Sequence, residues 1–175
     1  MIHLILGGAR SGKSNFALQK ALELSQSKQQ NVTYVATATA IDPEMAARIS
    51  RHQQERPRDW LLAEIPLDLT AFVSQHQGSI LLIDCLTLWL NNQLYHYPEQ
   101  DFAGLFTGLC NVLKNSQVDI ILVANEVGLG VIPMGAISRQ FVDQAGWLNQ
   151  AIARCADKVT LVAAGLPLIL KGGNK

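Results

Sequence analysis

Short runs of apolar residues alternate along this chain with longer segments in which apolar residues recur at helical spacing. The short runs predict strands over residues 2–6, 32–37, 79–84, 119–124 and 158–163. A last apolar run at 166–170 follows Gly165 so closely that we expect it to pair antiparallel at the edge of the sheet. The alternation predicts an α/β fold with a mostly parallel sheet and helices on both of its faces.

Helical spacing is clearest in three segments. Apolar side chains recur over 102–113, and again over a predicted helix at about 138–156. A third helix is expected to begin at Asp42, which can cap it, and to stop at Pro57. The segment 125–136 contains three glycines and a proline, and we expect it to form a long mobile loop.

Composition narrows the class of protein. With 175 residues, of which 49% are hydrophobic, the chain suits a single domain over residues 1–175. Its 14 Lys and Arg balance 14 Asp and Glu, so there is no broad basic field of the kind that binds nucleic acid, and we expect no nucleic-acid partner. The charged fraction of 16% lies below the usual value of about 25% and favours a homo-oligomer.

The cysteines and the apolar runs bear on the location of the protein. Cys85, Cys110 and Cys155 have neither disulfide nor metal-ligand spacing, and we expect buried thiols in a reducing cytoplasm. The first residues lack the pattern of a secretory signal, and no apolar run approaches the ~18 residues of a membrane span. The sequence therefore predicts a cytoplasmic protein without a membrane span.

The octapeptide GGARSGKS carries the strongest chemical signal. Gly7, Gly12, Lys13 and Ser14 match the phosphate-loop consensus, directly after a predicted strand and directly before a helical segment. Glycines let backbone N–H groups turn toward phosphates, and the helix N-terminus adds its positive end. The lysine would reach the β- and γ-phosphates, and the serine would bind Mg²⁺. The motif predicts a P-loop NTPase domain; a glycine turn with a chance Lys-Ser pair is the alternative.

Asp84 ends the apolar run SILLID, where a strand would deliver its carboxylate beside the phosphate loop. There it could bind Mg²⁺ directly or through water, or accept a proton from a substrate hydroxyl. The alternative is an aspartate that only caps a helix beginning at Leu86. The phosphate loop upstream favours the functional interpretation.

His52 lies among three arginines, Arg48, Arg51 and Arg56. One interpretation is a histidine that ends an apolar helix stripe and bonds a backbone carbonyl. The other begins with charge, because nearby guanidinium groups lower the pKa of an imidazole modestly from about 6.5 and leave the ring neutral and nucleophilic at neutral pH. The same groups would hold phosphate oxygens, so the arrangement suits attack on a nucleotide phosphate.

Six segments together resemble one protein family: GGARSGKS, YVATA, DPEMAARISRHQQERP, LLIDCLTLWLNN, ANEVGLGVIP and FVDQAGWLNQ. They run along essentially the whole chain and are similar to the bifunctional adenosylcobinamide kinase/adenosylcobinamide-phosphate guanylyltransferases of the cobalamin pathway. The resemblance implies that a nucleoside triphosphate, ATP or GTP, phosphorylates adenosylcobinamide. It further implies that GTP guanylylates His52 with loss of pyrophosphate, and that adenosylcobinamide phosphate then accepts the GMP to give adenosylcobinamide-GDP.

Together with the motifs, the resemblance implies a set of site residues. His52, Lys13 and Asp84 would be catalytic, and Ser14 and Asp84 would bind Mg²⁺. The implied nucleotide contacts are Gly7, Gly8, Ala9, Arg10, Ser11, Gly12, Lys13, Ser14, Ala36, Thr37, Ala38, Gln53, Gln54, Glu55, Arg56, Glu64 and Asp84. The family is trimeric, which implies a homotrimer here.

Two positions are open. Val142 stands where relatives often have arginine in an F-R-D-x-x-G segment, which puts any contact made by that arginine in doubt. Glu126 could act as a base or organise a metal, or it could form only a salt bridge within its loop.

Other P-loop functions are less well supported. A small-molecule kinase without guanylyltransferase activity is the nearest alternative, and it would have no need of His52. A GTPase switch reads guanine with an N-K-x-D sequence, whereas the comparable residues here are Asn125, Glu126, Val127 and Gly128. A motor ATPase would need a nucleic-acid surface, which a net charge of zero does not favour.

Overall fold

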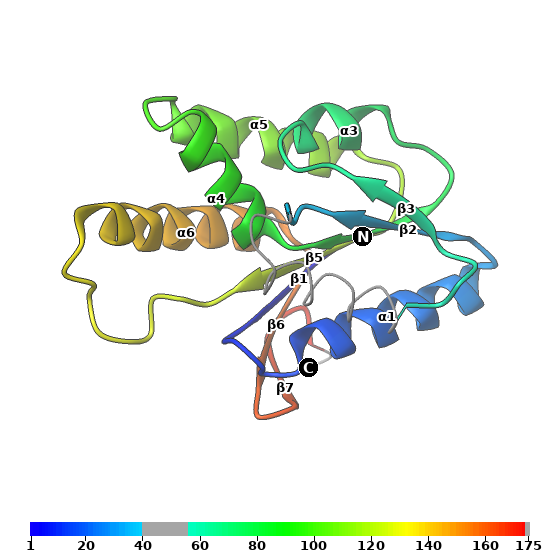
Figure 1. Cartoon of the computed structure of the whole chain (residues 1–175). Coiled ribbons are helices and arrows are strands. Elements are labelled where there is room, and N and C mark those ends of the chain that lie inside the picture. Colours follow the sequence, from blue (N-terminus) through cyan, green and yellow to red (C-terminus); the bar gives the residue numbers. More distant parts are fainter. Residues whose placement is uncertain (40–55, 174–175) are drawn as a thin grey trace.

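The computed structural model of this chain describes residues 1–39 and 56–173. Its centre is a seven-stranded sheet with the order β3-β2-β4-β5-β1-β6-β7 (Figure 1). The strands are β1 Ile2–Gly7, β2 Val32–Ala36, β3 Leu61–Glu64, β4 Ile80–Asp84, β5 Ile120–Asn125, β6 Lys158–Ala163 and β7 Leu166–Lys171. Every strand that the apolar runs predict is present, with each end within one residue of its predicted position.

The sheet is parallel except at one edge. β1 pairs in parallel with β5 and β6, β2 with β3 and β4, and β4 with β5. β7 pairs antiparallel with β6 through a two-residue turn in which Ala164 and Gly165 both have positive φ, 51° and 79°. A turn of this kind matches the twist of the strands that it joins. The predicted antiparallel edge strand is thus confirmed.

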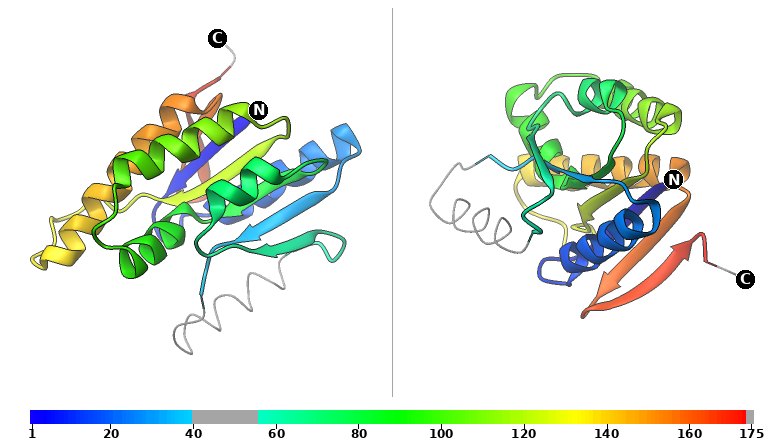
Figure 2. Two further views of the ribbon diagram at one scale, coloured as in Figure 1. Left: turned by 90° about the horizontal axis from the view of Figure 1, so that it is seen from above. Right: turned by 90° about the vertical axis from the view of Figure 1, so that its right-hand side faces the viewer.

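The described helices cover the sheet on both faces, because successive side chains along each strand point to opposite sides. Along β1, Leu4 and Leu6 pack into one apolar cluster and Ile5 into another. Helix α1, Lys13–Lys28, covers the Ile5 face. Helices α3 Leu69–Gln75, α4 Leu86–His96, α5 Phe102–Asn115 and α6 Ala136–Cys155 cover the other face (Figure 2).

Helices α5 and α6 follow from the apolar stripes that predict them. The Asp101 side chain caps α5 by accepting a hydrogen bond from the Gly104 N–H at 3.0 Å. The buried stripe of α5 is Phe102, Phe106, Leu109 and Leu113. No helix in the described part of the chain is long and apolar enough to cross a membrane.

Two elements escaped the sequence analysis, and one prediction about the cysteines is wrong in part. β3 is an edge strand of four residues with mostly exposed side chains, and α3 has seven residues, so neither is long enough for a clear period.

Cys85 is buried as predicted, but Cys110 and Cys155 are only half-buried, because their helix positions lie at the border of the packed stripe.

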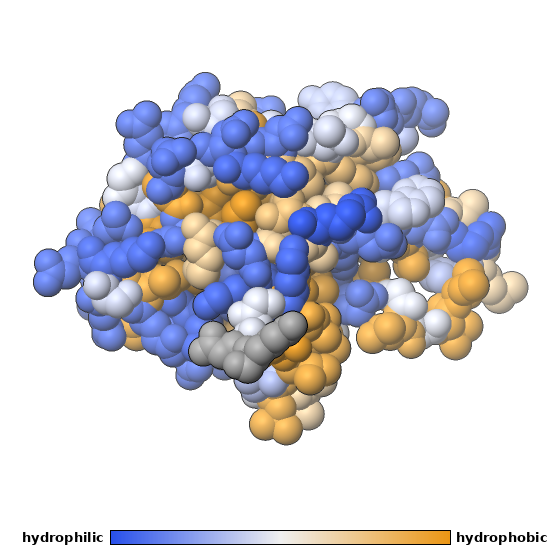
Figure 3. Space-filling model, turned by 180° about the vertical axis from the view of Figure 1, so that it is seen from behind, coloured by the Kyte–Doolittle hydropathy of each residue, from blue (hydrophilic) through white to orange (hydrophobic). Residues whose placement is uncertain are grey.

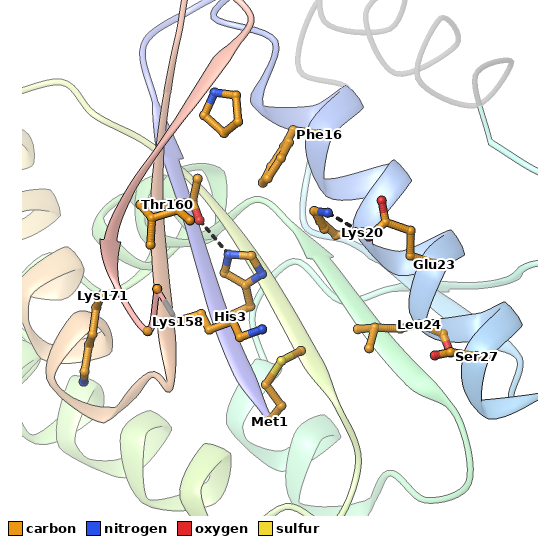
Figure 4. A pocket seen from close by; sticks show the side chains of 14 residues that line it. Met1, His3, Phe16, Lys20, Glu23, Leu24, Ser27, Lys158, Thr160 and Lys171 are labelled. Atoms are coloured by element: carbon orange, nitrogen blue, oxygen red, sulfur yellow. Dashed lines mark hydrogen bonds and ion pairs between the residues drawn. The ribbon is translucent and has the colours of Figure 1, made fainter. Parts of the chain in front are cut away.

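His3 lies inside the sheet, at the inner wall of a groove between α1 and the β6–β7 hairpin (Figure 4). The groove has a volume of about 610 Å³, and none of the described residues that we predict as nucleotide contacts lines it. His3 Nε2 shares a hydrogen bond with Thr160 Oγ1 at 2.9 Å. Burial, and secondly the charges of Lys158 and Lys20, lower the pKa of His3 to about 4. The imidazole is therefore neutral at neutral pH.

We predict that acid destabilises the fold through His3. Its pKa in the folded chain lies below that of an unfolded histidine, about 6.5, so proton uptake favours unfolding. The stabilisation is fully present above pH ~6.5 and is lost as the pH falls toward 4, by on the order of 3 kcal/mol. The variant His3→Gln cannot take up this proton. Its unfolding free energy in urea should therefore vary less between these pH values than that of the wild type, and parallel profiles would contradict the prediction.

Candidate nucleotide-binding site

The carboxyl ends of the parallel strands form one edge of the sheet, and most of the described residues that we predict as contacts lie there. Gly7 at the end of β1 is in register with Asn125 at the end of β5. Ala36 at the end of β2 is in register with both Glu64 of β3 and Asp84 of β4. Open α/β sheets bind their ligands at this edge. The pairing therefore brings together residues that lie far apart in the sequence.

The phosphate loop is a tight turn between β1 and α1, and two of its positions leave no room for a side chain. A Cβ on Gly7 would lie 2.4 Å from Ser11 Oγ and 2.6 Å from the Val162 carbonyl oxygen. Gly12 has a φ of +93°, and a Cβ there would come within 3.2 Å of the Gly165 Cα. The shape of the loop thus depends on close packing against β6 and the β6–β7 turn.

Hydrogen bonds hold the same loop. The Ser11 N–H donates to the Gly8 carbonyl at 3.2 Å, and the Ser11 carbonyl accepts from the Gly165 N–H at 2.8 Å. Lys13 Nζ folds back across the loop and donates to the Gly8 carbonyl at 3.2 Å. Arg10 is exposed and has a left-handed backbone, with a φ of 57°. The lysine ammonium therefore lies against the turn that its motif predicts to hold phosphate.

The first turn of α1 offers backbone N–H groups to an anion. Its N-cap residue is Gly12, which provides no side-chain cap, and the turn contains no acidic residue. Ser14 lies in this turn and is half-buried. An uncapped helix N-terminus attracts anions through its N–H groups and its dipole. The arrangement suits a phosphate group.

Asp84 is held by a buried tyrosine. The Tyr34 hydroxyl donates to Asp84 Oδ2 at 3.1 Å, and the Arg56 guanidinium lies 4.2 Å from the centroid of the Tyr34 ring. Burial, and secondly the charge of Asp84, raise the pKa of Tyr34 far above its ordinary value, so the phenol stays protonated and continues to donate. Arg56 and Asp84 are thus linked through one side chain that the sequence analysis did not identify.

Thr37 joins the end of β2 to the end of β4. Its buried hydroxyl donates to the Cys85 carbonyl at 2.7 Å and accepts from the Cys85 N–H at 2.9 Å. Its own carbonyl accepts from Asn92 Nδ2 at 2.9 Å, and its N–H donates to the Asp84 carbonyl at 3.4 Å. Both protons that Thr37 can donate are therefore used within the protein, and its predicted contact with a nucleotide stays a prediction.

The remaining predicted contacts fall into three groups. Gly8 and Ala9 are exposed in the phosphate loop, and Ala38 is half-buried just beyond β2. Glu64 is exposed at the end of β3. Four predicted residues lie outside the described part of the chain: His52, Gln53, Gln54 and Glu55.

Three residues at this edge were missed from sequence: Tyr34, Asn92 and Asn125. Asn92 Nδ2 bonds both the Thr37 carbonyl and, at 3.1 Å, the Pro66 carbonyl, and so it ties two strand ends together. Asn125 Oδ1 and Ser11 Oγ are buried without a hydrogen-bond partner among the described residues. Tyr34 and Asn125 are polar residues in or at the end of a strand, which by itself names no partner, and Asn92 lies inside α4, where the sequence gives no signal of its role.

Mg²⁺ prefers oxygen ligands and keeps several waters. No group of three or more His, Cys, Asp or Glu side chains in the described ranges could hold a metal ion by itself. Ser14 and Asp84 are oxygen donors, and β4 lies two strand spacings, or ~10 Å, from β1 across the sheet. The pair fits a cation that takes most of its ligands from phosphates and water, and it does not fit a cage made by the protein alone.

Glu126 and Val142 can now be located. The Glu126 carboxylate accepts a hydrogen bond from the Gly128 N–H at 2.6 Å, and the Glu126 N–H donates to the Gly7 carbonyl at 3.0 Å. Glu126 therefore shapes the start of the β5–α6 loop. The predicted position of this loop is confirmed, and the mobility of the loop stays a prediction. Val142 is half-buried in α6.

We predict that two glycine substitutions separate strain in the loop from contact with a ligand. Gly7→Ala places a methyl group against Ser11 and the Val162 carbonyl, so it should lower the unfolding free energy by about 1–3 kcal/mol and abolish GTP binding. A methyl group on Gly8 meets nothing within 4 Å, so Gly8→Ala should unfold in urea like the wild type. Unchanged stability and unchanged GTP affinity in Gly7→Ala would refute this account of the loop.

Solved structures confirm the P-loop NTPase fold. The chain is similar to the flagellar accessory protein FlaH from Methanocaldococcus jannaschii, with a TM-score of 0.59, 15% identity, and coverage of 99% of this chain and 80% of that one. It is also similar to a second solved structure, an ATPase domain, with a TM-score of 0.53, 14% identity, and coverage of 91% of this chain and 68% of that one. At these identities the likeness concerns the fold alone.

Two curated proteins share far more sequence identity with this chain than these solved structures do. The chain is 48% identical over 174 residues to the bifunctional adenosylcobalamin biosynthesis protein CobP of Pseudomonas aeruginosa, covering 98% of each chain. It is 35% identical over 186 residues to the bifunctional adenosylcobalamin biosynthesis protein CobU of Escherichia coli, covering 98% of this chain and all of that protein. Residues 3–170 match the family described as cobinamide kinase / cobinamide phosphate guanyltransferase. The chain therefore belongs to that family, as its sequence motifs predict.

Proposed function

We propose that this chain is a bifunctional kinase and guanylyltransferase, and that it converts adenosylcobinamide first to its phosphate and then to adenosylcobinamide-GDP. The observation that carries the proposal is the match of residues 3–170 to the family, combined with a phosphate loop of the required shape. Relatives that cover almost the whole chain are named as bifunctional adenosylcobalamin biosynthesis proteins. ATP or GTP would be the phosphoryl donor and GTP the guanylyl donor.

In the kinase reaction, the phosphate loop would hold the triphosphate. Lys13 would exchange the Gly8 carbonyl for the β- and γ-phosphates, and the N–H groups of the first turn of α1 would bind phosphate oxygens. Ser14 and Asp84 would hold Mg²⁺, which neutralises charge on the phosphates when it is bound. The remaining described contacts, Gly7 to Ser14, Ala36, Thr37, Ala38, Arg56 and Glu64, stay predictions.

Phosphoryl transfer then needs a free hydroxyl oxygen and a place for its proton. The hydroxyl oxygen of the aminopropanol arm attacks the γ-phosphorus, the bond from that phosphorus to the β–γ bridging oxygen breaks, and the nucleoside diphosphate leaves. Asp84, across the sheet from the loop, is oriented by Tyr34 and could accept the hydroxyl proton. Binding of Mg²⁺ and acceptance of a proton are alternatives for this carboxylate.

Guanylyl transfer would proceed through His52. A neutral ring nitrogen attacks the α-phosphorus of GTP, a P–N bond forms, and pyrophosphate leaves. A phosphate oxygen of adenosylcobinamide phosphate then attacks the same phosphorus, which breaks the P–N bond and restores the histidine. The arginines near His52 in the sequence would offset the charge on the pyrophosphate.

The described residues on either side of 40–55 support this role. Thr39 Oγ1 donates to Asn92 Oδ1 at 3.2 Å, at the carboxyl edge of the sheet. Arg56 lies over Tyr34, which bonds Asp84 at the same edge. His52 itself lies outside the described residues.

We further propose a homotrimer in which β7 makes a subunit contact. β7 is an edge strand with six exposed residues, and its edge-strand patch, Leu166, Leu168, Ile169 and Leu170, is 55–72% exposed. This patch is one of the orange regions in Figure 3. An open, apolar edge strand invites pairing or packing with another chain. A cytoplasmic location stays a prediction.

We predict that GTP labels His52 covalently. Incubation with [α-³²P]GTP should give a phosphoramidate, which is labile to acid and stable to alkali, and His52→Ala should abolish the label. The same variant should keep its ability to phosphorylate adenosylcobinamide, because that step does not use the imidazole.

Lys13→Ala should weaken both reactions if one loop serves both nucleotides.

The matched control for this experiment is His96→Gln, which alters an exposed histidine at the end of α4. It should be labelled like the wild type. A label that persists in His52→Ala would move the nucleophile to another residue. Normal guanylylation of Lys13→Ala would refute the shared loop.

We predict that Leu168→Asp dissociates the oligomer, because it places a charge in the edge-strand patch. Analytical ultracentrifugation should give a trimer for the wild type and a monomer for the variant. Leu62→Asp makes the same change on β3, the opposite edge of the sheet, and should remain trimeric. Dissociation by Leu62→Asp alone would assign the contact to the other edge.

A further inference from the structure

The loop between β5 and α6 is unusually apolar for a surface segment. Residues 127–134, VGLGVIPM, contain no polar side chain. Five side chains in this loop and at the start of α6, Leu129, Val131, Ile132, Met134 and Ile137, are 77–97% exposed and are termed the loop patch. Figure 3 shows it as a projecting orange region, separate from the edge-strand patch. Clustered apolar side chains left in water mark a surface that contacts something else.

Hydrogen bonds hold the loop at both of its ends. Near its start, the Glu126 carboxylate accepts from the Gly128 N–H at 2.6 Å. Near its end, Arg139 Nη1 donates to the Pro133 carbonyl at 3.2 Å and also to the Met134 carbonyl. These bonds order the two ends of the loop, while its apolar side chains stay exposed. The loop patch is therefore exposed on a loop whose two ends are held by hydrogen bonds.

The loop that carries the patch begins beside the nucleotide-binding edge. The Glu126 N–H donates to the Gly7 carbonyl at 3.0 Å, so the first residue of the loop lies against the first residue of the phosphate motif. From there the loop extends outward past the end of β5 (Figure 1). A molecule seated on the patch would thus lie beside the triphosphate and not on it.

We infer that the loop patch is the docking surface for the corrin ring of cobinamide, the acceptor in both reactions. The inference takes its ligand from the proposed function. The ring is large, its rim carries methyl groups and neutral amides, and its reactive hydroxyl ends a flexible arm. The ring must therefore sit at some distance from the transferred phosphorus. An uncharged apolar surface next to the phosphate loop suits such a ligand and does not suit a phosphate.

A second copy of the chain is the other candidate occupant. It has its own surface in the edge-strand patch, where an open strand edge is added to the exposed apolar side chains. The loop patch has no open strand edge, and the loop that carries it is joined to the phosphate loop by the hydrogen bond from Glu126 to Gly7. The position of the loop therefore favours the acceptor substrate.

The test is the double variant Val131→Ser/Met134→Ser, which alters two side chains that are 95% and 97% exposed and so should not disturb folding. Equilibrium dialysis with cobinamide, followed by its visible absorption, measures docking without turnover. The variant should bind cobinamide at least about tenfold more weakly than the wild type. Labelling by [α-³²P]GTP without corrinoid and the sedimentation coefficient should be unchanged. Tyr95→Ser, which alters an 81% exposed residue of α4, is the matched control and should bind normally.

Three results would overturn the inference. The first is unchanged cobinamide binding in the double variant. The second is a shift in its sedimentation coefficient, which would assign the loop patch to a subunit contact, and the third is a loss of GTP labelling. The proposed function fails separately. If the double variant loses cobinamide binding as expected but the wild type transfers neither phosphate nor GMP, the docking surface stands and the two activities do not.

Discussion

The nucleotide edge depends on the close approach of two backbones, that of the phosphate loop and that of the β6–β7 turn. The Ser11 carbonyl bonds the Gly165 N–H at 2.8 Å, and a side chain on Gly12 would come within 3.2 Å of the Gly165 Cα. A side chain on Gly7 would come closer still, within 2.6 Å of the Val162 carbonyl oxygen. The glycines of the motif therefore serve contact within the protein as well as room for a phosphate. The antiparallel hairpin at the edge of the sheet is a structural part of the site.

The contact between the phosphate loop and the β6–β7 turn places the proposed subunit interface close to the nucleotide-binding site. β7 begins directly after Gly165, so a subunit that packs on the edge-strand patch would lie one turn away from the phosphate loop. On the other side of the loop, the Glu126 N–H bonds the Gly7 carbonyl and begins the apolar segment that we assign to the acceptor. The phosphate loop thus lies between two exposed apolar surfaces, and each reaches it through a backbone hydrogen bond. This arrangement would let one loop serve a nucleotide, an acceptor and a subunit contact without shared side chains.

The sequence predicts those parts of the fold that have a local signal. Six strands, the antiparallel edge, the helices at α5 and α6 and the phosphate motif all follow from periodicity or from consecutive residues. Bonds between distant residues have no such signal. Tyr34 and Asp84 are 50 positions apart, and Thr37 and Cys85 are 48 apart, so their pairing depends on the strand order. For the same reason, the sequence did not reveal the bonds that tie Thr37 to Cys85 and Asn92, and its contact with a nucleotide stays a prediction.

Two described side chains at the nucleotide edge, Cys85 and Tyr34, are poorly suited to attack a phosphorus. Burial raises the pKa of Cys85 to about 12, and Tyr34 is held protonated, so neither can attack a phosphorus near neutral pH. The other histidines are badly placed. His3 is near the amino end of β1, His76 bonds Ser79 just before the start of β4, and His96 is ~15 Å along α4 from Leu86. The three described histidines of the four in the sequence are thus remote from the nucleotide edge, which agrees with the proposal that His52 carries the guanylyl group.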